Sequence, residues 1–197
     1  MAGMPTRRSV HRHALRDILR RNVDDERFLE IFADFARLIR ASVKLCKHGD
    51  GFPEDEVNYM EELLGLSFVL LQAKIRRVSE AASPLTPPQA RALGCSYKNT
   101  GNTLMELIWA VGNYYKHRDA WRKKVWEEKT AGEQESKPLR QSRNTRRIIE
   151  KVGIERYSTG MLTAYSFFEI DWASDCAPLA DKVQEWANAV YEKCAKS

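Results

Sequence analysis

The sequence of 197 residues contains no apolar run long enough to cross a membrane. A transmembrane helix needs about 20 predominantly apolar residues. The longest apolar run, Leu63–Ala73, is interrupted by Gln72 and flanked by charged residues on both sides. A hydrophobic segment typical of a secretory leader is also missing near the N-terminus. We therefore expect a cytoplasmic protein without a membrane span.

Cysteine is scarce and widely spaced. The four cysteines form no Cys-x-x-Cys pair and are Cys46, Cys95, Cys176 and Cys194. This spacing predicts neither a disulfide framework nor a zinc site, and thiols of a cytoplasmic protein stay reduced. The four histidines show no metal-ligand spacing either. We expect no metal and no cofactor.

Sequence motifs of several enzyme classes are absent. The chain has no Gly-x-x-x-x-Gly-Lys-Ser/Thr, no Gly-x-Gly-x-x-Gly, no Gly-x-Ser-x-Gly and no His-Glu-x-x-His. Repeats of Glu-x-x-His, which a di-iron helical bundle uses, do not occur. These absences argue against the common nucleotide-binding, serine-hydrolase and metalloprotease classes.

Alternation of polar and apolar residues with a period of two, which indicates a half-buried strand, is missing too. Apolar residues instead recur every three or four positions in nearly every segment. The composition, 43% apolar and 30% charged, is that of a globular protein. The pattern predicts an all-α bundle of about six to eight helices. We expect a basic N-terminal arm or short helix over residues 1–22 and a single helical domain over residues 23–197.

Capping residues and helix breakers predict where the helices begin and end. A break near Asn22, with Asp24 or Asp25 as the next N-cap, separates a short first helix from a long second one. The second helix ends before Gly49. Further helices are expected over residues 53–82, 89–93, 119–129, 142–152, 158–170 and 174–193.

One more long helix is expected in the middle of the chain. Asn99 or Asn102 is its predicted N-cap, and the helix reaches His117. Residues 130–138 are polar and lie between two predicted helices, so we expect a mobile loop there.

Positive charge is concentrated in two segments. The first 21 residues hold six arginines against one acidic residue, Asp17, and residues 116–147 hold eleven basic residues against five acidic ones. The whole chain has a formal net charge of +5. Because neutralising phosphates releases counterions, two basic patches on an otherwise acidic molecule favour a polyanionic partner. A solvated arm or a targeting segment is the alternative interpretation of the first segment.

The segment from Glu106 to Trp121 is the richest in candidate functional side chains. Glu106, Ala110, Asn113 and His117 share one face of the predicted helix, and we expect this polar stripe to face away from the core. Asn113 and His117 lie one helical turn apart, so both can act on the same ligand. The opposite, apolar face holds Leu104, Leu107, Ile108, Val111 and Tyr115.

His117 is a candidate general acid or base, because the ordinary pKa of histidine lies near neutrality. Lys116 and Arg118 beside it would attract a phosphate. A structural role is the alternative, since basic residues interact favourably with the C-terminal end of a helix. The candidate nucleic-acid contacts are Lys116, Arg118, Arg122, Arg140, Arg143, Arg146 and Arg147.

Asn-x-x-x-His at the end of a long helix, in an all-helical protein, resembles the active-site motif of the HEPN superfamily. There an arginine, a polar residue and three further residues precede the histidine. The resemblance implies a bundle of four or five helices that dimerises and brings two motifs into one cleft. Many HEPN proteins are metal-independent ribonucleases of toxin and antiviral systems, and others are inactive binding domains. By this pattern Asn113 is the polar residue, and His117 helps to activate the ribose 2′-hydroxyl or protonates the leaving oxygen.

Gly112 stands where HEPN proteins carry the arginine. Such an arginine is expected to stabilise negative charge on the transferring phosphate, a contribution of about two or more powers of ten in rate. Lys116, Arg118, Arg122 or an arginine within residues 140–147 is able to replace it if the fold brings one close. An arginine over His117 would favour catalysis, and tyrosines there would favour binding.

Three functional hypotheses follow, in order of preference. The first is a non-catalytic HEPN-like homodimer that binds RNA or a protein partner in a bacterial defence or toxin–antitoxin system. The second is a metal-independent endoribonuclease with His117 as the proton-transfer residue and Asn113 as its positioning partner. The third is a peripheral membrane protein attached through its first helix. That helix offers little bulky apolar surface for insertion: Val10, Ala14, Leu15, Ile18 and Leu19.

Overall fold

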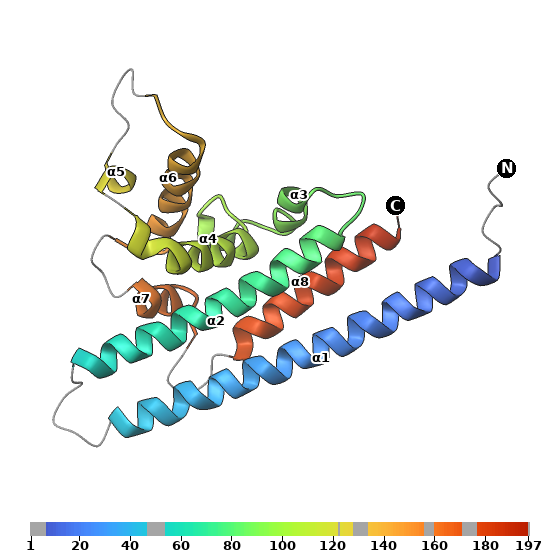
Figure 1. Cartoon of the computed structure of the whole chain (residues 1–197), viewed down its shortest axis with the longest axis horizontal. Helices are drawn as coiled ribbons and strands as arrows, with labels where there is room; N and C mark the ends of the chain where they lie inside the picture. Colours follow the sequence, from blue (N-terminus) through green and yellow to red (C-terminus); the bar gives the residue numbers. More distant parts are fainter. Residues whose placement is uncertain are drawn as a thin grey trace.

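The computed structural model describes residues 7–46, 54–121, 123–127, 134–155, 160–170 and 177–196. Side chains are described for residues 25–44, 57–121, 125–127, 134–155, 160–170 and 177–196. Within these ranges the structure has no strand, so the prediction of an all-α bundle is confirmed. The helices are α1 (Arg7–Cys46), α2 (Glu54–Ala81), α3 (Pro87–Arg91), α4 (Leu104–His117), α5 (Lys123–Trp126), α6 (Lys137–Glu150), α7 (Gly160–Phe167) and α8 (Ala177–Ala195) (Figure 1). Single 3-10 turns lie at Tyr97–Asn99 and Arg118–Ala120.

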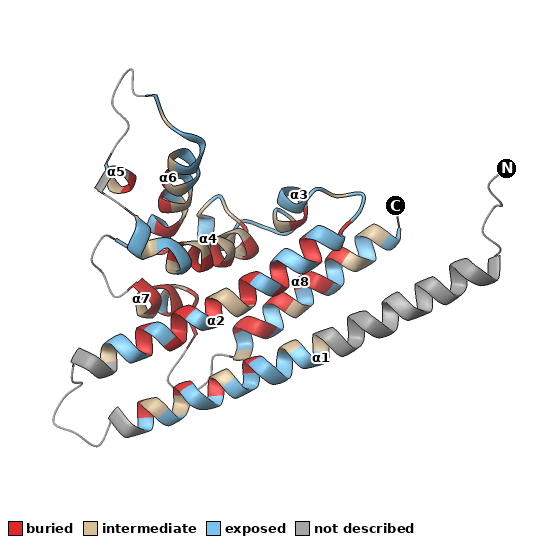
Figure 2. Ribbon diagram, in the orientation of Figure 1, coloured by how far each residue is buried: buried red, intermediate tan, exposed pale blue. Residues whose placement is uncertain are grey.

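Helix α2 lies at the centre of the bundle. It contacts α1, α3, α4, α7 and α8, and its most extensive contact is with α4. Buried residues accordingly recur along the described length of α2, whereas α1 shows a wide exposed face (Figure 2). The helices α1, α2 and α8 run side by side, and α4 packs on α2 with α6 on its other side (Figure 1).

The predicted helix break near Asn22 is wrong. Helix α1 is continuous from Arg7 to Cys46. This stretch contains neither glycine nor proline, so nothing in it interrupts the backbone hydrogen bonds. Asp25, one of the two expected N-caps, lies inside the helix and forms an ion pair with α2 instead.

Two glycines let α2 and α4 approach closely in antiparallel directions. A Cβ atom on Gly65 would overlap the ring of Tyr115, so the tyrosine ring lies directly over this glycine. A Cβ atom on Gly112 would lie 3.0 Å from the carbonyl oxygen of Phe68 and 3.1 Å from Cβ of Gln72. Both contacts are tighter than ordinary packing of a side chain allows, so this crossing depends on the absence of side chains.

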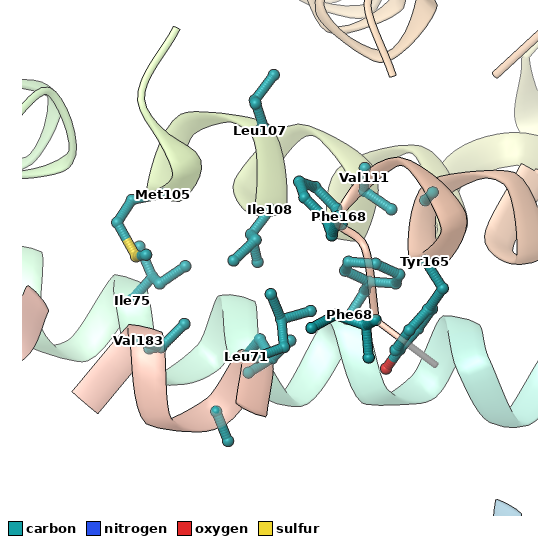
Figure 3. Close-up of a cluster of buried hydrophobic side chains, with 14 of the residues drawn as sticks. Phe68, Leu71, Ile75, Met105, Leu107, Ile108, Val111, Tyr165, Phe168 and Val183 are labelled. Atoms are coloured by element: carbon teal, nitrogen blue, oxygen red, sulfur yellow. The ribbon is translucent and has the colours of Figure 1, made fainter. Parts of the chain in front are cut away.

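The hydrophobic core fills the space between α2, α4, α7 and α8. Figure 3 shows α2 and α4 facing each other across it, while Leu107 points to the other side of α4. Leu107 is nevertheless fully buried, because α6 covers that side. The prediction that Leu107 shares a face with Ile108 is therefore wrong. The residues drawn in the core include Phe68, Leu71, Ile75, Met105, Ile108, Val111, Tyr165, Phe168 and Val183.

A buried ion pair attaches α1 to the bundle. The ammonium group of Lys74 on α2 pairs with the carboxylate of Asp25. The same carboxylate accepts a hydrogen bond of 2.8 Å from Gln184 on α8, so it joins three helices. The Lys74 side chain is only 5% exposed, and burial lowers its pKa to about 8. Lys74 is therefore still largely protonated at neutral pH and depends on its partner.

Helix α4 begins at Leu104, one residue later than it would begin with Asn102 as its N-cap. Thr103, rather than Asn99 or Asn102, caps the helix. Its hydroxyl accepts from the backbone N–H of Glu106 at 3.3 Å, and its own N–H donates to the Glu106 carboxylate at 2.9 Å. This reciprocal capping box follows the Thr-x-x-Glu pattern, which is a stronger signal than an isolated asparagine.

The region after α4 also differs from the prediction. The expected helix over residues 119–129 is reduced to a 3-10 turn and the short α5, because the backbone is extended at Trp121. Helix α6 begins at Lys137, five residues earlier than predicted, with Ser136 as its N-cap and Pro138 in its first turn. Residues 130–133 of the expected loop lie outside the described residues, and Lys137 and Pro138 belong to α6.

We expect Asp25→Asn to lower the free energy of unfolding by about 3 kcal/mol, because it leaves a buried lysine without its charged partner. Urea unfolding followed by circular dichroism measures the change. Asp34→Asn is a matched control on the same helix. Its pair with Arg37 is exposed, so that substitution should cost less than about 0.5 kcal/mol. Equal effects of the two substitutions would contradict this account of how α1 is held.

Candidate functional site

The candidate site is built on α4, whose first turn is tied to α3. The hydroxyl of Thr103 donates a hydrogen bond of 2.6 Å to the backbone carbonyl of Arg91, the last residue of α3. The capping box with Glu106 fixes the same threonine. The position of α3, and of the Arg91 side chain that it carries, is therefore linked to the start of α4.

Asn113, a predicted site residue, is held by α2. The side-chain nitrogen of Gln72 donates to the carboxamide oxygen of Asn113 at 2.7 Å and to the backbone carbonyl of Trp109 at 3.0 Å. Gln72 is buried, so it spans the crossing of α2 and α4 and fixes both residues. With its oxygen occupied, Asn113 keeps its NH2 group as a donor. The predicted polar stripe thus does not face away from the protein, since Ala110 in its middle is buried as well.

His117 is the last residue of α4. Its side chain is exposed and lines a hollow together with Asn113. We call this the histidine hollow, which has a volume of about 620 Å³. Its walls come from α4, from the turn after it, from α5 and from α6. The lining residues are Trp109, Asn113, His117, Ala120, Trp121, Val125, Pro138, Gln141, Ser142, Asn144 and Thr145. No arginine or lysine of the described part of the chain is among them, and no tyrosine either.

The structure explains why position 112 carries no arginine. Gly112 faces α2 rather than the histidine hollow, and even a methyl group there would press on the backbone of Phe68. The arginine of the HEPN motif therefore has no space at this position. None of the candidate replacements lines the histidine hollow within the described residues.

The candidate cations beside the motif lie in different places. Arg118 turns to α2, where it pairs with Glu62 and lies over the ring of Tyr115, 4.7 Å from its centroid. Tyr115 donates a hydrogen bond to the same carboxylate, and burial together with that bond raises its pKa to about 12. Arg118 is therefore engaged in the packing of α2 against α4. Lys116 is exposed and lines a second hollow.

Two of the predicted contacts on α6 are buried. Arg143 pairs with Glu135 at 3.0 Å, and Arg146 pairs with Glu150 at 3.2 Å. Both side chains are almost completely covered, and Arg146 also donates a hydrogen bond of 3.2 Å to the backbone carbonyl of Val125 on α5, so neither faces a ligand. The other two arginines of α6, Arg140 and Arg147, are exposed. The remaining candidate, Arg122, lies outside the described residues.

The second hollow lies between α2, α3 and α4. We call it the basic hollow, and its volume is about 450 Å³. It adjoins the histidine hollow, because Trp109 and Asn113 line both. The full lining is Val69, Gln72, Ala73, Arg76, Glu80, Pro87, Arg91, Trp109, Asn113 and Lys116.

Two cations of the basic hollow were not predicted from the sequence. Arg76 and Arg91 lie outside the two segments in which positive charge is concentrated. The only signal for this part of the site is Gln72, a buried polar residue within an apolar helical pattern, which needs a hydrogen-bonding partner. That signal predicts a contact but not its location.

The described part of the chain has neither a cluster of metal-binding side chains nor a membrane-spanning helix. It contains no group of three or more histidine, cysteine or acidic residues placed to hold a metal ion. None of its helices is long and apolar enough to span a membrane. Comparisons with models of protein families, with curated proteins and with solved structures find no match.

We expect Gly112→Ala to destabilise the protein by about 1–3 kcal/mol, because the added methyl group forces α2 and α4 apart. This loss should outweigh the preference of a helix for alanine over glycine, which is about 1 kcal/mol. Gly112→Arg, which places an arginine where the HEPN motif has one, should be more damaging still. Thermal unfolding followed by circular dichroism measures both.

Ala189→Arg is the control for the added arginine, because residue 189 lies on an exposed face of α8. This variant should unfold at the temperature of the wild type. A Gly112→Arg variant as stable as the wild type would show that position 112 has space for the arginine after all.

Proposed function

We propose that the protein is an RNA-binding module of HEPN-like architecture without ribonuclease activity. The observation that carries this proposal is the pair of adjoining hollows that share Trp109 and Asn113. The basic hollow offers cations for phosphates. The histidine hollow offers amides, hydroxyls and aromatic rings, which are the groups that contact sugars and unstacked bases. A single-stranded RNA that crosses Trp109 and Asn113 would reach both.

The distribution of cations favours binding over catalysis. Metal-independent cleavage needs a positive charge close to the phosphate that His117 would act on. In the described part of the chain the histidine hollow has no arginine or lysine in its lining, and Gly112 leaves no room for one. The available cations lie in the neighbouring hollow, where they are suited to hold a phosphate at rest.

Ribonuclease activity is the second candidate function. It is supported by the placement of Asn113 and His117 in one hollow, with His117 exposed at the end of its helix. A role in a bacterial defence or toxin–antitoxin system belongs to the same proposal and rests on the HEPN resemblance alone.

We expect the protein to bind labelled single-stranded RNA with an affinity that falls as salt is added. With three phosphates neutralised, the logarithm of the binding constant should fall by about 2 per tenfold increase in salt. Fluorescence anisotropy in EDTA at several salt concentrations measures this slope. The RNA should stay intact with the wild type and with His117→Ala, because the described lining of the histidine hollow contains no cation to stabilise the phosphate charge.

Two results would overturn this function. Cleavage by the wild type that His117→Ala abolishes, while the variant keeps its helical content, would establish the ribonuclease. Absence of RNA binding at low salt would refute the RNA-binding function and direct attention to a protein partner.

The proposal includes a homodimer, which the HEPN resemblance implies. Large apolar side chains exposed on α1 and α2 offer a surface for the second copy: Leu29, Ile31, Leu38, Tyr59 and Leu66. Ile31 and Leu38 are seven residues apart and share one face of α1. Burying them between two copies would remove apolar surface from water.

Static light scattering is expected to give twice the mass of the 22.7 kDa chain. The double substitution Ile31→Glu and Leu38→Glu should yield monomers with unchanged helical content, because charges on that face oppose burial. Ala189→Glu, on the exposed face of α8, should leave the dimer intact. A wild type that elutes and scatters as a single chain would contradict dimerisation.

A further inference from the structure

The basic hollow gathers three cations from three consecutive helices. Arg76 comes from α2, Arg91 from the end of α3 and Lys116 from the last turn of α4 (Figure 1). A volume of about 450 Å³ lies within the range of sites that bind small molecules. The three side chains therefore surround a space that an anionic group can enter.

The charges in this hollow are poorly balanced. Partial burial and then the positive charge of Arg76 lower the pKa of Lys116, so these two cations are close enough to repel each other. Glu80 is the one acidic residue in the described lining, and its carboxylate accepts a hydrogen bond of 2.8 Å from Nε of Arg76. Both partners of that pair are largely exposed, so an incoming anion displaces Glu80 at little cost.

Arg91 is held in position for a ligand. Its guanidinium lies over the ring of Trp109, 4.3 Å from the centroid, and its backbone carbonyl accepts from Thr103. Partial burial lowers the pKa of Arg91, while the charge of Glu106 acts in the opposite direction. A guanidinium stacked on an aromatic ring keeps its edge available, and that edge matches two oxygens of a phosphate.

A neutral donor completes the lining. Gln72 uses its NH2 group on Asn113 and Trp109, which leaves the NH2 group of Asn113 at the boundary of the two hollows. An amide donor beside three cations suits a tetrahedral oxyanion better than a planar apolar ligand.

We propose that the basic hollow is a phosphate-binding site in which Arg91 and Lys116 grip the phosphate oxygens and Arg76 joins them once released from Glu80. The site specifies how the protein would bind RNA, and the identity of its biological ligand rests on the proposed RNA-binding function. The phosphate is supplied either by the end of an RNA chain or nucleotide, as a monoester, or by the RNA backbone, as a diester.

The first experiment uses inorganic phosphate and adenosine 5′-monophosphate, titrated into the isotope-labelled full chain and followed by NMR. Arg91→Gln is expected to weaken both by about tenfold or more, since a hydrogen-bonded charge is lost. Lys116→Gln removes an exposed cation without disturbing packing and should also weaken binding. Glu80→Gln should strengthen binding about threefold, because the competing carboxylate is gone.

Matched controls separate the site from overall charge. On the exposed face of α8, Lys182→Gln lowers the net charge by one, as the Arg91 and Lys116 variants do, and Glu185→Gln raises it by one, as Glu80→Gln does. Neither control should alter phosphate binding. Thermal unfolding of each variant verifies that its fold is kept. The site is refuted if Arg91→Gln and Lys116→Gln bind phosphate as the wild type does, or if the wild type shows no binding.

The second experiment compares two RNA oligonucleotides of one sequence, with a 5′-phosphate or a 5′-hydroxyl. If Arg91→Gln weakens only the phosphorylated RNA, the site holds a terminal phosphate. If it weakens both equally, the site holds the backbone. Phosphate binding without RNA binding would refute the proposed function and leave the site standing. RNA binding that Arg91→Gln does not change, together with no phosphate binding, would refute the site alone.

Discussion

The close antiparallel approach of α2 and α4 is the constraint on which the rest of the structure depends. Gly65 and Gly112 remove the side chains that would hold the helices apart, and Tyr115 fills the space over the first glycine. At this short separation Gln72 reaches α4 and fixes Asn113. The core on one side of the crossing and the two hollows beside it both follow from this geometry.

Basic residues in the described part of the chain serve two different purposes. Lys74, Arg143 and Arg146 are buried, and each pairs with an acidic side chain of the same chain. Lys74 attaches α2 to α1, Arg143 links α6 to the segment before it, and Arg146 also donates to a backbone carbonyl of α5. Arg91 and Lys116 are only partly covered and line a hollow. Counting positive charges along a sequence does not distinguish the two groups, because burial decides which of them a ligand can reach.

The helical class and most helix positions were predictable from the sequence, because apolar periodicity and glycine or proline breakers are local signals. The break expected near Asn22 was wrong, since an aspartate favours a helix start only where the preceding backbone stops being helical. The N-cap of α4, Thr103, was predictable too, although it was not predicted, because Thr-x-x-Glu is a local capping pattern.

The candidate site was predictable only in part. Asn113 and His117 do line one hollow, as two residues one turn apart on a helix are able to do. Arg76 and Arg91 belong to other helices, and no local pattern reports which helices meet. The reason for Gly112 is likewise a property of the α2–α4 contact, which appears in the sequence only as a small residue in a helix.

The three cations of the basic hollow all lie between positions 76 and 116 of the chain, so the walls of the hollow are consecutive helices. By contrast, the bond between Gln184 and Asp25 joins residues 159 positions apart. Closing a short loop costs less chain entropy than closing a long one, and contacts of low sequence separation form faster. The walls of the hollow are thus expected to meet earlier in folding than α1 and α8, which close the bundle around a site already assembled.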